Sequence, residues 1–94
     1  MFWNIIKVSK IFPKEKRLLK LTFEDGLQGT YTLPKNVCTG VFTPLVSDDN
    51  FYNVCIKYGV LVWENKQQNY YLDVAPEPIY FGIKNSPNNH FDAD

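Results

Sequence analysis

Residues 18–33, LLKLTFEDGLQGTYTL, are the stretch that decides the fold. Leu19, Leu21 and Phe23 alternate with polar residues, and a similar alternation returns after Asp25-Gly26. Because successive side chains of a strand point to opposite faces, each half predicts a strand with one apolar face. Asp-Gly between two such runs favours a type I′ turn, in which both central residues have positive φ. The stretch therefore predicts a β-hairpin.

Shorter patterns on either side of the hairpin predict the remaining elements. Strands are expected over residues 4–11, 55–64 (a second hairpin turning at Gly59) and 70–74, and helical turns over 34–40, 48–54 and 75–80. Val41, Phe42 and Leu45 are expected to fill the core. The predicted class is α+β: a small, mainly antiparallel mixed sheet in β-β-β-α-β-β order, with short helices on one face. One domain is expected over residues 1–83, followed by a polar, flexible tail over 84–94.

The charge balance narrows the function classes. Ten Lys and Arg residues balance ten Asp and Glu residues, which argues against a general nucleic-acid binder. The first twenty residues are basic, however, because only Glu15 opposes their cations. This segment predicts either a solvated outer face or a docking patch for an acidic partner or a nucleic-acid backbone. The basic residues are Lys7, Lys10, Lys14, Lys16, Arg17 and Lys20.

The start of the chain and the cysteines indicate a cytoplasmic protein. Residues 1–4 lack the basic and apolar regions of a secretory signal, and the apolar runs are too short for a membrane helix. Cys38 and Cys55 each lie beside Val or Ile, so we expect reduced, buried thiols that act as small hydrophobic side chains.

Residues able to do chemistry are sparse. The only histidine, His90, falls in the predicted tail, where nothing rigid would hold it near a substrate. Asp73 and Glu77 could form an acid–base pair, but capping and charging the helical turn that begins at Ala75-Pro76 explains them more simply. No catalytic residue, cofactor or metal site is predicted.

Aromatic residues near the C-terminal end form the best candidate binding surface, although core packing is the interpretation that the sequence favours for them. The leading hypothesis is a non-enzymatic module that binds a protein partner. The alternative is a nucleic-acid-binding accessory protein that uses the basic segment, and an enzyme using Asp73 and Glu77 ranks last. A homodimer is compatible with exposed sheet edges. The candidate partner-binding residues are Trp63, Tyr70, Tyr71, Tyr80 and Phe81.

An ordered set of motifs between residues 4 and 80 resembles the bacterial domain-of-unknown-function family 2442. The motifs are LTFEDG at 21–26, GVFTPL at 40–45, Phe51, Trp63, DVAPE at 73–77 and Ile79-Tyr80. The resemblance implies a β-β-β-α-β-β domain that is often encoded beside another small protein, as in a toxin–antitoxin-like pair. The chain departs from the family pattern in a longer link over residues 64–72, and it is too short to hold the helix-turn-helix domain that some relatives carry.

Overall fold

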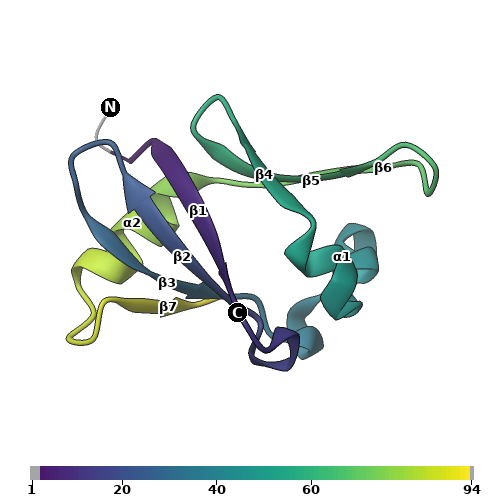
Figure 1. Ribbon diagram of the computed structural model, residues 1–94, viewed down its shortest axis with the longest axis horizontal. Coiled ribbons are helices and arrows are strands. Elements are labelled where there is room, and N and C mark those ends of the chain that lie inside the picture. The colour runs from purple at the N-terminus through teal and green to yellow at the C-terminus, as the bar shows by residue number, and fades with distance from the viewer. Residues whose placement is uncertain (1–2, 94) are drawn as a thin grey trace.

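Figure 1 shows the computed structural model, which describes residues 3–93. Its strands form two sheets rather than the single sheet expected, and the predicted α+β class is confirmed. The four-stranded sheet has the order β1 (Ile5–Ile11), β2 (Leu18–Phe23), β3 (Gln28–Thr32) and β7 (His90–Asp92). The three-stranded sheet has the order β4 (Val54–Lys57), β5 (Val60–Asn65) and β6 (Tyr70–Val74).

The helices are short. The two α-helices are α1 (Asp48–Tyr52) and α2 (Pro76–Lys84), and the 3₁₀ helices are η1 (Lys14–Lys16), η2 (Lys35–Val37) and η3 (Gly40–Val46). Ser47 is the N-cap residue of α1, since its side chain accepts a hydrogen bond from the Asn50 amide at 3.2 Å. In η3, Leu45 is buried as expected, whereas Val41 points into solvent, which corrects its predicted place in the core.

The 18–33 hairpin is present, but its turn differs from the expectation. Among its central residues only Gly26 has positive φ, so the type I′ turn predicted for Asp25-Gly26 is wrong. The Gly26 amide donates to the Phe23 carbonyl, and the Phe23 amide donates to the Leu27 carbonyl. This is the pattern of a three-residue loop that ends in a left-handed glycine. Positive φ at two successive residues occurs instead in the β4–β5 turn, at Tyr58-Gly59.

The core lies between α2 and one face of the four-stranded sheet, and continues under β5 of the second sheet (Figure 1). The Phe23 and Tyr80 rings meet edge to face, with centroids 5.1 Å apart. Helix α2 approaches so closely that a Cβ on Gly29 would overlap the Ile83 side chain. Ala75 is the N-cap residue of α2 and no side chain caps the helix, so the predicted capping role of Asp73 is wrong.

The predicted flexible tail is also corrected. Residues 90–92 form β7, which pairs in parallel with β3 so that His90, Phe91 and Asp92 lie beside Thr30, Tyr31 and Thr32. The Phe91 and Tyr31 rings are stacked, with centroids 6.1 Å apart. Alternation over three residues is too short a pattern to predict a strand, and the long-range pairing supplies the missing stability.

Candidate functional site

The structure does not bring the predicted aromatic residues together on one surface. Trp63 is completely buried, and its indole N–H donates to the Phe51 carbonyl at 2.7 Å. Tyr80 is also buried, and its hydroxyl donates to the Asp25 carboxylate, which lowers the pKa of that carboxyl. Both residues are therefore part of the core, and their predicted role in partner contact is corrected. Phe81 is partly exposed on α2, where it packs beside Trp3.

The two remaining aromatic residues lie on β6, at the edge of the three-stranded sheet. Tyr70 is half-buried against the core, whereas Tyr71 faces the opposite side and is 52% exposed. The Lys57 ammonium lies 5.7 Å from the centre of the Tyr71 ring and 2.7 Å from the Glu64 carboxylate, and this ion pair raises the pKa of Lys57. A shallow groove of about 200 Å³ adjoins this end of the strand. Its lining residues are Glu64, Asn65, Lys66, Asn69, Tyr70 and Tyr71.

The β6 edge differs from the other sheet edges within residues 3–93. Natural proteins protect edges with lysines, bulges or very short strands. Strand β1 carries Lys7, Lys10 and an irregularity after Ile5, and β7 has only three residues. Strand β4 lies beside β1, and the β4–β5 turn is joined to β1 by a 2.9 Å hydrogen bond from the Ile5 amide to the Gly59 carbonyl. In contrast, β6 presents YYLDV, with Asp73 as its one charged residue, so its edge is open to another strand.

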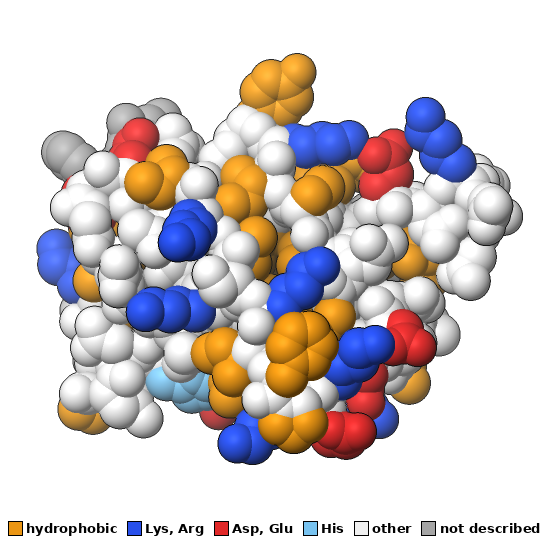
Figure 2. Space-filling model, in the orientation of Figure 1, with side chains coloured by type: hydrophobic (Ala, Val, Ile, Leu, Met, Phe, Trp, Pro, Cys, Tyr) orange, Lys and Arg blue, Asp and Glu red, His pale blue; other side chains and the backbone are white. Residues whose placement is uncertain are grey.

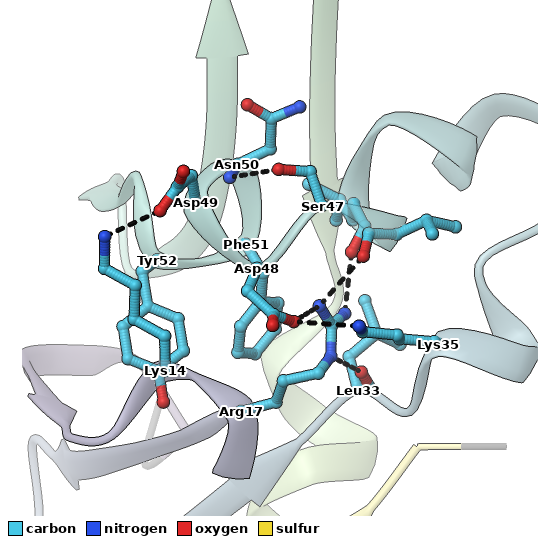
Figure 3. Close-up of polar contacts among 12 residues, drawn as sticks. Lys14, Arg17, Leu33, Lys35, Ser47, Asp48, Asp49, Asn50, Phe51 and Tyr52 are labelled. Carbon is cyan, nitrogen blue, oxygen red and sulfur yellow. Dashed lines mark hydrogen bonds and ion pairs between the residues drawn. The ribbon is translucent and has the colours of Figure 1, made fainter.

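Arg17 does not belong to an exposed basic patch as predicted, because it is buried. Its guanidinium donates to the Leu33 carbonyl at 2.9 Å, the Leu45 carbonyl at 2.7 Å and the Asp48 carboxylate at 2.9 Å (Figure 3). It also lies 4.5 Å from the centre of the Phe51 ring. Arg17 therefore joins the hairpin to η3 and α1. The Arg17 hydrogen bond lowers the pKa of the Asp48 carboxyl.

Lys14 is also engaged, because its ammonium lies 2.6 Å from the Asp49 carboxylate on α1 (Figure 3). An open groove of about 380 Å³ lies beside this pair, and the exposed Phe12 ring packs in it against Tyr52 with centroids 5.5 Å apart. Charges of both signs line this groove, so it does not select for an anionic ligand. The other basic residues, Lys7, Lys10, Lys16 and Lys20, are exposed.

The outer face of the four-stranded sheet is mostly polar, with the half-buried Ile11 and Leu18 at one end. Figure 2 shows lysine side chains and the histidine on this side of the molecule, among white atoms that belong to the backbone and to side chains of other types. Lys20 lies directly opposite Thr30, and Thr30 lies beside His90. The Thr30 hydroxyl is 2.6 Å from His90 Nδ1, and His90 Nε2 is 2.7 Å from the Asp92 carboxylate.

This arrangement corrects the expectation that nothing would hold His90. The sequence does contain a weak signal, since His90-Phe91-Asp92 alternates in the manner of a strand.

Asp73 and Glu77 are both exposed, on β6 and at the start of α2. Cys38 is buried, which raises the pKa of its thiol, whereas Cys55 is exposed, contrary to the expectation of two buried cysteines.

Over residues 3–93, no three His, Cys, Asp or Glu side chains form a group that could hold a metal ion. Within the same range, no helix has the length and apolarity needed to cross a membrane. A scan against protein-family models gives no match for the chain, and searches of curated proteins and of solved structures give none either. The similarity to family 2442 therefore stays a prediction from the motifs.

Proposed function

We propose that the chain is a non-enzymatic, cytoplasmic protein-interaction module that receives an extended segment of a protein partner along β6. The observation that carries the proposal is the β6 edge itself, which has five residues and neither a lysine nor a proline. Adding a strand there satisfies the outward backbone amides and carbonyls of β6, which is how many domains capture extended peptides.

Side chains on the two faces of β6 define the chemistry of the segment that would fit. Tyr70, Leu72 and Val74 pack against the core on one face. Tyr71 and Asp73 lie on the other face and are exposed. A matching segment therefore carries apolar residues at alternate positions, and a basic residue beside Asp73 would complement its charge. Tyr71 serves as the aromatic anchor, since tyrosine buries a large area at a low entropy cost.

The identity of the partner is the first thing to test. The motif resemblance favours the product of a neighbouring gene, in a toxin–antitoxin-like pair. The tagged full-length chain would be co-expressed with that product and, in parallel, used to capture proteins from cell extract. A captured protein would then be titrated against wild-type chain to obtain its Kd.

The matched variants are Tyr71→Lys on β6 and Tyr58→Lys in the β4–β5 turn, where Tyr58 is 99% exposed. Both variants add one positive charge, but only the first alters the β6 edge. We expect Tyr71→Lys to weaken binding by about 30-fold, as for a typical aromatic anchor of about 2 kcal/mol, and Tyr58→Lys to bind like the wild type. Hydrogen exchange should show slowed exchange at β6 amides in the complex. Equal binding by the two variants would refute the assignment of the β6 edge.

Nucleic-acid binding is the second candidate, and the observation that favours it is the shared outer face of Lys7 and Lys20. Phosphate contacts by these lysines predict an affinity that falls steeply as salt is added. Titration of the full-length chain with a labelled single-stranded oligonucleotide in low salt would measure this. The absence of binding at low salt would exclude the second candidate without touching the first.

A further inference from the structure

The trio of Thr30, His90 and Asp92 on the outer sheet face has a defined direction of hydrogen bonding. An ionised carboxylate only accepts hydrogen bonds, so the Asp92 contact places a proton on His90 Nε2. In the neutral imidazole this leaves a lone pair on Nδ1, and the Thr30 hydroxyl therefore donates to it. A hydroxyl that donates to an imidazole, with a carboxylate orienting the ring, is the arrangement that activates a nucleophile.

The surroundings of the trio leave the hydroxyl open to small reactants. Thr30 is half-buried in the middle of β3, and the His90 side chain is 24% exposed. The pairing of β7 with β3 fixes the His90 backbone beside Thr30, and the Asp92 carboxylate orients the His90 ring. Lys20 is exposed directly opposite Thr30, and directly opposed strand residues have Cβ atoms about 5 Å apart. Lys7 lies on the same face, opposite Thr22.

We propose that Thr30 is an acyl-acceptor hydroxyl, with His90 as its general base, and that its donors are small acyl phosphates. The lysines select the donor class, because an acyl phosphate carries its negative charge on the group that leaves. A lysine at the strand position opposite the hydroxyl favours such a donor over a neutral ester. The face is open and shallow, so it suits a small donor rather than one that must be enclosed.

The reaction balances without any further reagent. Thr30 Oγ1 attacks the carbonyl carbon of the acyl phosphate while its proton moves to His90 Nδ1. The bond between the carbonyl carbon and the phosphate oxygen then breaks, and the departing phosphate takes that proton. The products are an ester on Thr30 and inorganic hydrogen phosphate, and no atom is oxidised or reduced. Asp92 is a positioning residue, because it acts through the imidazole.

The test incubates the full-length chain with acetyl phosphate and follows acetylation by intact-protein and peptide mass spectrometry. Hydroxylamine then separates the products, because it cleaves an ester on threonine and leaves an amide on lysine. We expect a hydroxylamine-sensitive acetyl group on Thr30 that is lost in Thr30→Val and kept in Thr30→Ser. His90→Gln should slow its formation by about 100-fold or more, which is the usual contribution of a general base.

Matched variants separate the chemistry from folding. Thr32→Val changes the same strand and face beside Asp92 and should leave acetylation of Thr30 unchanged. Asp92→Ala should slow the reaction, and Asp92→Glu should partly restore it. Lys20→Gln should slow the reaction with acetyl phosphate more than with the neutral ester p-nitrophenyl acetate.

Three results would overturn the proposal. They are acetylation on lysines alone, equal ester formation in Thr30→Val and Thr32→Val, and an unchanged rate in a folded His90→Gln variant. If His90→Gln does not fold, the comparison of Thr30→Val with Thr30→Ser still tests whether Thr30 is the acceptor, because neither replacement changes the imidazole. The β6 variants are independent of this reaction, so failure here leaves the proposed docking function standing.

Discussion

Replacing Arg17 by methionine tests whether the buried guanidinium holds the hairpin to the helical segment. Methionine keeps most of the length of the side chain but removes every donor. The Leu33 and Leu45 carbonyls would then lose charge-assisted hydrogen bonds of 2.9 and 2.7 Å inside the protein. The Asp48 carboxylate would lose the Arg17 guanidinium at 2.9 Å and keep Lys35 at 3.6 Å.

The magnitude follows from burial. The Arg17 side chain is only 5% exposed, and removing one member of a buried ion pair typically costs about 3–5 kcal/mol. Lys35 still partly compensates Asp48, so we expect about 3 kcal/mol, a large fraction of the roughly 5–15 kcal/mol that stabilises small domains. The melting temperature should fall by roughly 12 °C or more for a domain of this size.

Urea unfolding followed by circular dichroism would measure the change in the free energy of unfolding. Lys14→Met is the matched control, because it breaks a shorter contact of 2.6 Å to Asp49, between side chains that are 47% and 78% exposed. That surface pair should contribute much less stability than the buried one, because water screens exposed charges. The buried guanidinium does not hold the hairpin to the helical segment if Arg17→Met destabilises the protein no more than Lys14→Met does. This comparison requires that the free energy of unfolding has the same slope against urea concentration in both variants.

Three further predictions concern stability. Gly29→Ala should destabilise the protein by about 1–3 kcal/mol in urea unfolding, because its Cβ would overlap Ile83 and the Asn89 carbonyl; a stability equal to that of the wild type would contradict this packing. The Tyr80 hydrogen bond holds the pKa of Asp25 below its ordinary value of 3.8, so its stabilisation is present above that pH and is lost as pH falls through the lowered pKa. Tyr80→Phe should therefore lose less stability than the wild type during acid titration followed by circular dichroism, and identical acid profiles would count against the contact. Deleting the residues after Ser86 should speed amide exchange in β3, since the deletion removes the pairing of β7; unchanged exchange rates would show that β7 does not protect this edge.

Sequence patterns predict where the strands of this fold lie in the chain better than they predict which elements pack against each strand. Alternation over residues 18–33 gives both strands of the first hairpin, because one of their faces is solvated. In β5, Leu61, Val62 and Trp63 are all buried, so alternation carries no information about which side is covered. The place of Trp63 within the core depends on α1, because its indole N–H donates to the Phe51 carbonyl.

Charge patterns predict the candidate sites less well, because charge alone does not indicate burial. Arg17 reads as one more member of a basic run. It is buried only because two distant carbonyls and Asp48 converge on it, and nothing local marks these partners. His90 shows the opposite case, since a polar segment without helical periodicity becomes ordered through its pairing with β3. Both residues depend on contacts that lie far apart in sequence.

The order of strands along the chain has a consequence for biosynthesis. Strands β4, β5 and β6 are consecutive, so their sheet can assemble once residue 74 has left the ribosome. The other sheet begins with β1 but receives β7 only after all the other described elements have been made. Of the edges that become paired in this sheet, the β3 edge therefore waits longest for its partner during translation, and unpaired edges of this kind are where nascent chains associate wrongly. Binding by the nascent-chain machinery would be most useful at β3, during the interval before residues 90–92 emerge.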